Sequence, residues 1–104
     1  MIKIKIFRNN NTDIYGFQVD SHGNKIICAA VSALAINTVN SIETYFNEPF
    51  EEEHAENGGY LRFTIPAIKQ GKHNHDINLL LKSFVLGVRG IEAEHPGDVH
   101  VDDM

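Results

Sequence analysis

Hydrophobic and polar residues alternate at the start of the chain, where isoleucines at positions 2, 4 and 6 are separated by lysines. A period of two predicts a strand over residues 2–8, with the isoleucines facing a core. A cluster of turn residues follows at 9–13. The β-prone residues from Ile14 to Val19 then predict a second strand, and we expect the two strands to pair as a hairpin.

The period changes after the polar stretch 20–25, which contains the turn signal Gly23-Asn24. Apolar residues now recur at steps of three and four, which predicts a helix of about five turns. Asn24 is a candidate N-cap, and the helix should run to Phe46 or Asn47, before Pro49. Its expected buried stripe consists of Ile27, Val31, Leu34, Ala35, Thr38, Ile42 and Tyr45.

Three further strands or strand candidates follow the first helix. The acidic residues 50–56 fit a strand or a loop, and Asn57-Gly58-Gly59 predicts a tight turn. Residues 60–65 are β-prone and end at Pro66. Residues 98–102 could add a last short strand through Val99 and Val101.

A second amphipathic helix is predicted before that last strand, with either Asn74 or Asp76 as its cap. Two glycines, Gly87 and Gly90, interrupt its pattern. Either they let another backbone approach closely, or they merely soften the end of the helix. The expected buried stripe consists of Ile77, Leu80, Leu81, Phe84, Val85, Val88 and Ile91.

The predicted order is therefore β-β-α-(β)-β-α-β, in a single domain spanning residues 1–104. Two amphipathic helices must bury their apolar stripes, and an antiparallel sheet offers the surface for this. We expect an α+β fold with an antiparallel sheet and two amphipathic helices.

Composition narrows the partners that this domain could bind. Aspartate and glutamate outnumber lysine and arginine by 14 to 9, a formal charge of −5. Because nucleic-acid binding needs a basic surface, we expect no direct nucleic-acid contact, and a basic protein partner fits better. The apolar runs are shorter than the ~20 residues of a membrane span, so no membrane contact is expected. A single cysteine cannot form an internal disulfide, which favours a cytoplasmic setting.

That cysteine, Cys28, lies at the start of the first predicted helix and six residues after His22. The N–H groups and the dipole of a helix start stabilise a thiolate. A nearby imidazole could take the thiol proton or hold the thiolate as an ion pair. The segment therefore predicts a cysteine nucleophile with a histidine base, and N–H groups around Cys28 left free for an oxyanion.

Each of these residues also has a purely structural interpretation. Cys28 could be a small buried hydrophobic residue, and His22 a surface loop residue. The hydroxyl of Ser32, one turn after the cysteine, could bond back to the carbonyl of Cys28. If the histidine is catalytic, Asp13 or Asp20 could orient it.

Other clusters indicate chemistry more weakly. His73 and His75 could ligate a metal, but a solvated turn is the better interpretation, and we expect no cofactor and no metal. The run Glu51–Glu53 fits a solvated face or an electrostatic guide for a basic substrate. The aromatic residues in this half of the chain fit the core better than an apolar substrate pocket; they are Phe50, Tyr60 and Phe63.

The string from Ile26 to Leu34, with Ser21-His22 shortly before it, resembles the ribosomal-processing cysteine proteases of bacteria. The opening Ile-Lys-Ile strand and the segment 87–91 resemble the same family. The resemblance implies a cytoplasmic, homodimeric endopeptidase that removes the N-terminal extension of a large-subunit ribosomal protein precursor. In that family the extension is apolar and ends in aromatic residues, and the mature substrate is basic.

By motif position, the resemblance implies that Cys28 is the nucleophile, His22 the general base and Ser32 a supporting residue. Two positions depart from the family pattern. The interval between His22 and Cys28 is shorter than usual, either through a deletion or because part of a mobile loop is missing from the sequence. Lys25 stands where the family tends to carry aspartate. The alternative function is a non-catalytic module that binds peptide or ribosomal protein on the same fold.

Overall fold

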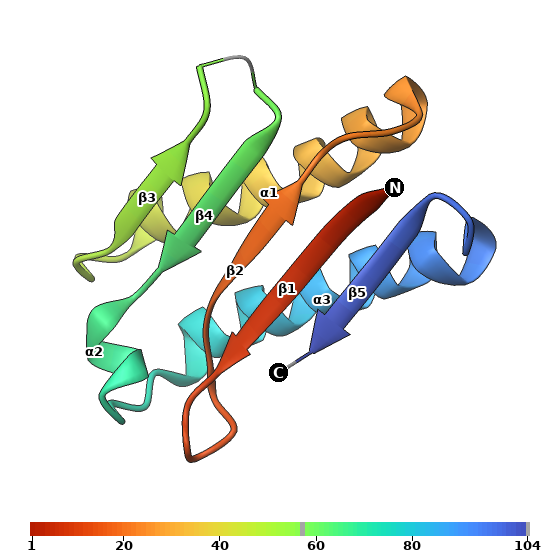
Figure 1. The fold of residues 1–104 in the computed structure, drawn as a ribbon. Helices are drawn as coiled ribbons and strands as arrows, with labels where there is room; N and C mark the ends of the chain where they lie inside the picture. The colour runs from red at the N-terminus through yellow and green to blue at the C-terminus, as the bar shows by residue number, and fades with distance from the viewer. Residues whose placement is uncertain (57, 104) are drawn as a thin grey trace.

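The protein folds as one five-stranded sheet with two long helices on one face, in a computed structural model that describes residues 1–56 and 58–103 (Figure 1). The spatial order of the strands is β3-β4-β2-β1-β5. In chain order the elements are β1 (Ile2–Arg8), β2 (Ile14–Asp20), α1 (Lys25–Tyr45), β3 (Glu51–His54), β4 (Tyr60–Thr64), α2 (Pro66–Lys69), α3 (His75–Glu94) and β5 (Val99–Asp103).

The predicted α+β class and the predicted element order are confirmed. The acidic segment after the first helix, which the sequence left open, contains the strand β3. Asn57, the first residue of the predicted tight turn, lies outside the described residues, whereas Gly58 has a left-handed φ of 79°.

One strand pairing departs from a purely antiparallel sheet. The pairs β1–β2, β2–β4 and β3–β4 are antiparallel, but β5 pairs with β1 in parallel. The connection from β4 to β5 crosses over through α3, so that β5 runs in the same direction as β4. Because β4 itself runs in the direction of β1, β5 arrives parallel to β1 (Figure 1).

The two helices bury most of the stripes that their periodicity predicts, but Leu80, Val85 and Ile91 of α3 are only partly buried, and Tyr45 is a clear exception. Tyr45 was expected inside, but its side chain is 76% exposed because it lies in the last turn of α1, at the helix end. Leu34 is only partly buried, and it packs against the core. The buried residues of α1 are Ile27, Val31, Ala35, Thr38, Val39 and Ile42, and those of α3 are Ile77, Asn78, Leu81, Phe84 and Val88.

Helix α1 is long and apolar enough that length and composition alone would let it cross a membrane. In this fold it packs against α3, and its buried residues share one hydrophobic core with those of the sheet, which is the arrangement of a core helix. Of the two candidate caps of α3, Asn74 is the one used, since its side chain accepts from the N–H of Ile77 at 3.0 Å. At Gly87 the neighbour that approaches closely is the Leu34 side chain, and Gly90 faces open space.

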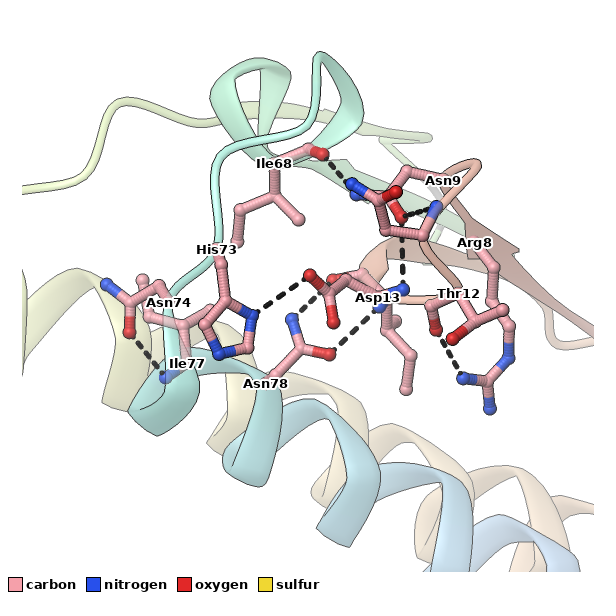
Figure 2. A network of polar contacts seen from close by, with 11 residues as sticks. Arg8, Asn9, Thr12, Asp13, Ile68, His73, Asn74, Ile77 and Asn78 are labelled. Atoms are coloured by element: carbon pink, nitrogen blue, oxygen red, sulfur yellow. Dashed lines mark hydrogen bonds and ion pairs between the residues drawn. The ribbon is translucent and has the colours of Figure 1, made fainter.

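A polar network fastens the β1–β2 turn to α2 and to the start of α3 (Figure 2). The Asn9 side chain donates to the carbonyl of Ile68 in α2 at 2.7 Å. Asn78, buried in α3, bonds both backbone groups of Ile14, at 2.9 and 3.0 Å. His73 contacts Asp13 at 3.0 Å from the loop before α3. The short helix α2, which the sequence did not predict, is thus fixed by contacts made at long range.

Two carboxylates hold β5 at the edge of the sheet. Asp103 accepts from Nε and Nη2 of Arg8 at 2.7 and 2.9 Å, and these hydrogen bonds hold the pKa of Asp103 below its ordinary value. Glu92 of α3 accepts from the N–H of Val101 at 2.7 Å, which lowers the pKa of Glu92.

Candidate active site

The first turn of α1 presents Cys28 at the end of the sheet where β2 leaves it. Asn24 caps the helix, as the sequence predicts, and its side-chain oxygen accepts from the N–H groups of Ile26 and Ile27 at 2.9 and 3.3 Å. The carbonyl of Asn24 accepts from the N–H of Cys28 at 2.8 Å. The cap therefore fixes the cysteine at the fourth helical position.

The same hydrogen bonds overturn one expectation about the site. We expected N–H groups around Cys28 to be free to bind an oxyanion. In the structure, the N–H groups of Ile26, Ile27 and Cys28 are all bonded to Asn24. The reason is that asparagine at the N-cap satisfies these donors with both its side chain and its carbonyl. While the cap is closed, these three groups cannot serve an oxyanion.

The Cys28 thiol is half-buried and lies against the residue that precedes His22. Its Sγ donates to the carbonyl of Ser21 at 3.6 Å. A carbonyl oxygen accepts from a thiol and not from a thiolate, so this contact must break when the sulfur becomes a nucleophile. In the structure the thiol is therefore hydrogen-bonded to the residue that precedes His22, the proposed base, and not to His22 itself.

His22 lies in the loop between β2 and α1, with an exposed side chain. Its ring packs over Gly59, next to the start of β4. Within the described residues no hydrogen bond joins the ring to Sγ of Cys28. Asp13 and Asp20, considered as orienting groups, bond to His73 and Gln18 instead. The fold brings His22 and Cys28 to the same end of the molecule, while the dyad itself stays a prediction.

A groove of about 280 Å³ runs along the middle of α1, from Ser32 to Asn40, between that helix and the β3–β4 hairpin, and neither Cys28 nor His22 lines it. We call it the α1–β3 groove. Ser21, whose carbonyl contacts Sγ of Cys28, and Ser32, one helical turn after Cys28, line the groove. No hydrogen bond from the Ser32 hydroxyl to the Cys28 carbonyl occurs among the described residues. The remaining lining residues are Val19, Ala35, Ile36, Val39, Asn40, Glu52, His54, Ala55, Gly58, Tyr60 and Leu61.

The acidic and aromatic candidates take different places around the groove. Glu51–Glu53 form most of β3, an exposed edge strand, and Glu52 lines the groove itself. Tyr60 is half-buried in the wall of the groove. Phe63 is fully buried in the core, and Phe50 packs against it with ring centroids 5.2 Å apart. Only Tyr60 is therefore placed to touch a ligand there.

His73 and His75 do not form a metal site in the part of the chain that the structure describes. Their rings contact Asp13 and Asp76, respectively. Among residues 1–56 and 58–103, no group of three or more histidine, cysteine, aspartate or glutamate side chains is arranged to hold a metal ion. The two histidines occupy the polar turn before α3 and its first residue.

A half-buried thiol at a helix start, beside an apolar groove, suits a cysteine protease, in which a thiolate attacks a peptide carbonyl. Comparison with known proteins supports this class. Residues 1–100 match the family model of the cysteine protease Prp. The chain therefore belongs to the Prp family of ribosomal-processing cysteine proteases.

Individual relatives match along nearly the whole chain. The ribosomal processing cysteine protease Prp of Bacillus subtilis (strain 168) is 23% identical over 107 residues, covering 97% of this chain and 96% of the relative. The structure of the S. aureus ribosomal processing protease Prp with a covalently linked product peptide matches with a TM-score of 0.88 and 23% identity, over 100% of both chains. SMU.848 from Streptococcus mutans matches with a TM-score of 0.83 and 26% identity, over 100% of this chain and 97% of its own.

Proposed function

We propose that this protein is a cytoplasmic endopeptidase that removes the N-terminal extension from a large-subunit ribosomal protein precursor. Cys28 acts as the nucleophile, His22 as the general base and Ser32 as a supporting residue. The observation that carries the proposal is the α1–β3 groove, which begins at Ser32, one turn after Cys28, and has in its wall Ser21, whose carbonyl accepts from Sγ of Cys28. An extended peptide lying there would bring its backbone past the thiol.

The reaction follows from the two groups. His22 takes the thiol proton, and Sγ attacks the carbonyl carbon of the scissile bond to form a tetrahedral intermediate. The intermediate collapses to a thioester on Cys28, and the imidazolium returns the proton to the leaving amine. A water molecule, deprotonated by His22, then attacks the thioester and releases the cleaved extension and the free thiol.

The groove fits the chemistry of the proposed substrate. Its walls are mainly apolar and include Val39 of α1 and Leu61 of β4, and Tyr60 adds an aromatic surface. An apolar, aromatic-ended extension would bury its side chains there. The acidic strand β3 borders the groove, and its charge is complementary to a basic mature protein. The S. aureus relative was solved with a covalently linked product peptide, which supports a peptide substrate here.

The test is incubation with the extended precursor, with the products measured by mass spectrometry. We expect Cys28→Ala to lower the cleavage rate by more than about 1,000-fold, because no other group forms the thioester. We expect His22→Ala to lower it by about 100-fold or more, the usual contribution of a general base. Asn37→Ala, at an exposed position of the same helix that does not line the groove, is the matched control and should cleave at a rate close to that of the wild type.

The same variants separate the protease from a non-catalytic binding module. In a protease, Cys28→Ala still binds the precursor peptide but leaves it uncut. Cleavage at the wild-type rate by Cys28→Ala would rule out the proposed nucleophile. If the unmodified protein binds the precursor and never cuts it, the binding module is the correct function.

We also propose that the chain forms a homodimer, as the family resemblance implies. Leu79 and Leu86, seven residues apart on α3, are 58% and 76% exposed, and both lie on the side away from the core. Such leucines are expected at a helix-mediated contact. Sedimentation equilibrium should show a dimer for the wild type and a monomer for Leu86→Glu. A monomeric wild-type protein at micromolar concentration would contradict this part of the proposal.

A further inference from the structure

The His22 ring packs against Gly59, on the side where a side chain of residue 59 would lie. A Cβ added to Gly59 would lie 2.8 Å from Cε1 of His22, 3.4 Å from Nε2 and 3.5 Å from Nδ1. These three ring atoms are the nearest neighbours of that position. We propose that Gly59 is a positioning residue for the imidazole of His22: the ring takes its place because residue 59 has no side chain. The inference rests on the proposed role of His22 as the base.

Backbone pairing brings Gly59 to this place. Strands β2 and β4 pair with Asp20 opposite Tyr60. The pairing continues one residue further, since the N–H of Ser21 donates to the carbonyl of Gly59 at 3.0 Å. His22 therefore leaves the sheet directly beside Gly59, and its ring folds over the glycine.

Ser21 links this contact to the nucleophile. Its N–H is bonded to Gly59, and its carbonyl accepts from Sγ of Cys28. The residue before His22 is thus held on one side by β4 and on the other by the thiol. Because the backbone is fixed in this way, the contact with Gly59 is what sets the direction of the ring relative to the sulfur.

The structure also indicates that a side chain at residue 59 would disturb the ring and little else. Among the described glycines, left-handed φ values occur at Gly58 and Gly71, so the backbone of residue 59 accepts alanine without strain. The atom that a new methyl group would meet belongs to an exposed side chain that can rotate away. Gly59→Ala should therefore move the imidazole at little cost in stability.

The experiment compares Gly59→Ala with Gly23→Ala, a control on the other flank of His22. A Cβ at Gly23 would lie 3.5 Å from Cγ1 of Ile2, an ordinary contact. We measure kcat and KM on the extended precursor, the thermal midpoint of unfolding, and the ring resonances of His22 by NMR.

Gly59→Ala should lower kcat by about 10- to 100-fold, part of what a general base contributes. KM and the unfolding midpoint should stay near wild type, and the Cε1–H resonance should shift. Gly23→Ala should stay within about two-fold of the wild-type kcat.

A double variant distinguishes this inference from the proposed function. In a His22→Ala background, Gly59→Ala should cause no further loss of kcat, because no ring remains to be displaced. An equal loss in both backgrounds, or an unshifted His22 resonance in Gly59→Ala, would overturn the positioning role. If His22→Ala retains the wild-type kcat, the proposed base is wrong, and the NMR shift alone decides whether Gly59 places the ring. If Gly59→Ala unfolds, recovery of the fold in the double variant supports the contact, and no recovery overturns it.

Discussion

At the scale of single residues, two glycines of this fold show how the neighbouring atom determines the effect of a side chain. A Cβ at Gly16 would lie 2.1 Å from the carbonyl oxygen of Phe63, within the β2–β4 pairing. A Cβ at Gly87 would lie 2.8 Å from Cδ1 of Leu34, the end of a side chain that can rotate. The first neighbour is backbone and cannot move without breaking the sheet, whereas the second can repack.

Gly16→Ala should therefore destabilise the protein far more than Gly87→Ala does. We expect the free energy of unfolding to fall by about 1–3 kcal/mol for Gly16→Ala, the usual cost of overpacking. For Gly87→Ala, the better helix propensity of alanine, worth up to ~1 kcal/mol, offsets part of the repacking cost. Urea denaturation of both variants measures the difference. Equal losses would contradict the distinction between backbone and side-chain neighbours.

Only part of the candidate site could be predicted from the sequence. The proximity of His22 and Cys28 follows from their short separation and from the turn at Gly23-Asn24. The role of Gly59 could not be predicted, because its contact with His22 depends on the pairing of β2 with β4, some forty residues apart in the chain. Local spacing carries no signal for such a contact.

At the scale of elements, the N-cap of α1 stabilises the start of the helix that contains Cys28, the proposed nucleophile. Replacing Asn24 by alanine leaves the N–H groups of Ile26 and Ile27 without their side-chain acceptor. We expect Asn24→Ala to lower the free energy of unfolding by about 1 kcal/mol. Asn24→Asp keeps an acceptor and is the matched control in the same denaturation series. A loss of the same size for Asn24→Asp would indicate that the amide, rather than the cap, matters.

The attachment of β5 should depend on pH. The hydrogen bonds from Arg8 to Asp103 and from the N–H of Val101 to Glu92 lower the pKa of both carboxyl groups. Since the folded pKa lies below the unfolded one, the stabilisation is complete at neutral pH. This stabilisation is lost as the pH falls below about 5 and passes through the pKa values that the two carboxyl groups have in the folded protein.

The double variant Glu92→Gln/Asp103→Asn tests this dependence. It should lose on the order of 1–3 kcal/mol at pH 7, the range for hydrogen bonds to charged groups. Its free energy of unfolding should also decline less between pH 7 and pH 3 than that of the wild type. Urea titrations across this range provide both values. An unchanged pH slope in the double variant would show that other groups control acid unfolding.

The elements themselves were largely predictable, because periods of two and near 3.6 residues follow burial on strands and helices. The features that the sequence did not predict have physical causes. Helix α2 is only four residues long, too short to show a period. The parallel arrival of β5 depends on the direction of β4 and on the crossover through α3, which no local pattern contains. Tyr45 continues the spacing of the α1 stripe, yet it lies in the last turn of the helix, where its side chain is exposed.

At the scale of the whole molecule, the net charge is −5, and the position of the acidic residues should matter for binding the proposed basic substrate. Strand β3, with three glutamates, forms one edge of the sheet beside the α1–β3 groove. Strand β5 forms the other edge, and its exposed Asp102 lies far from the groove in the strand order. Two variants with the same net charge can therefore separate local guidance from overall attraction.

Glu52→Gln/Glu53→Gln, which includes the glutamate that lines the groove, should raise KM for the basic precursor about two- to five-fold with little change in kcat, because complementary charge mainly accelerates association. The matched control, Glu94→Gln/Asp102→Asn, removes two exposed charges from the other side of the molecule and should leave KM nearly unchanged. Raising the salt concentration to 0.5 M should remove the difference, since screening then acts over about 4–5 Å. Steady-state cleavage assays at low and high salt measure all three effects. Equal increases in KM for both double variants would show that the net charge, and not the acidic strand beside the groove, attracts the substrate.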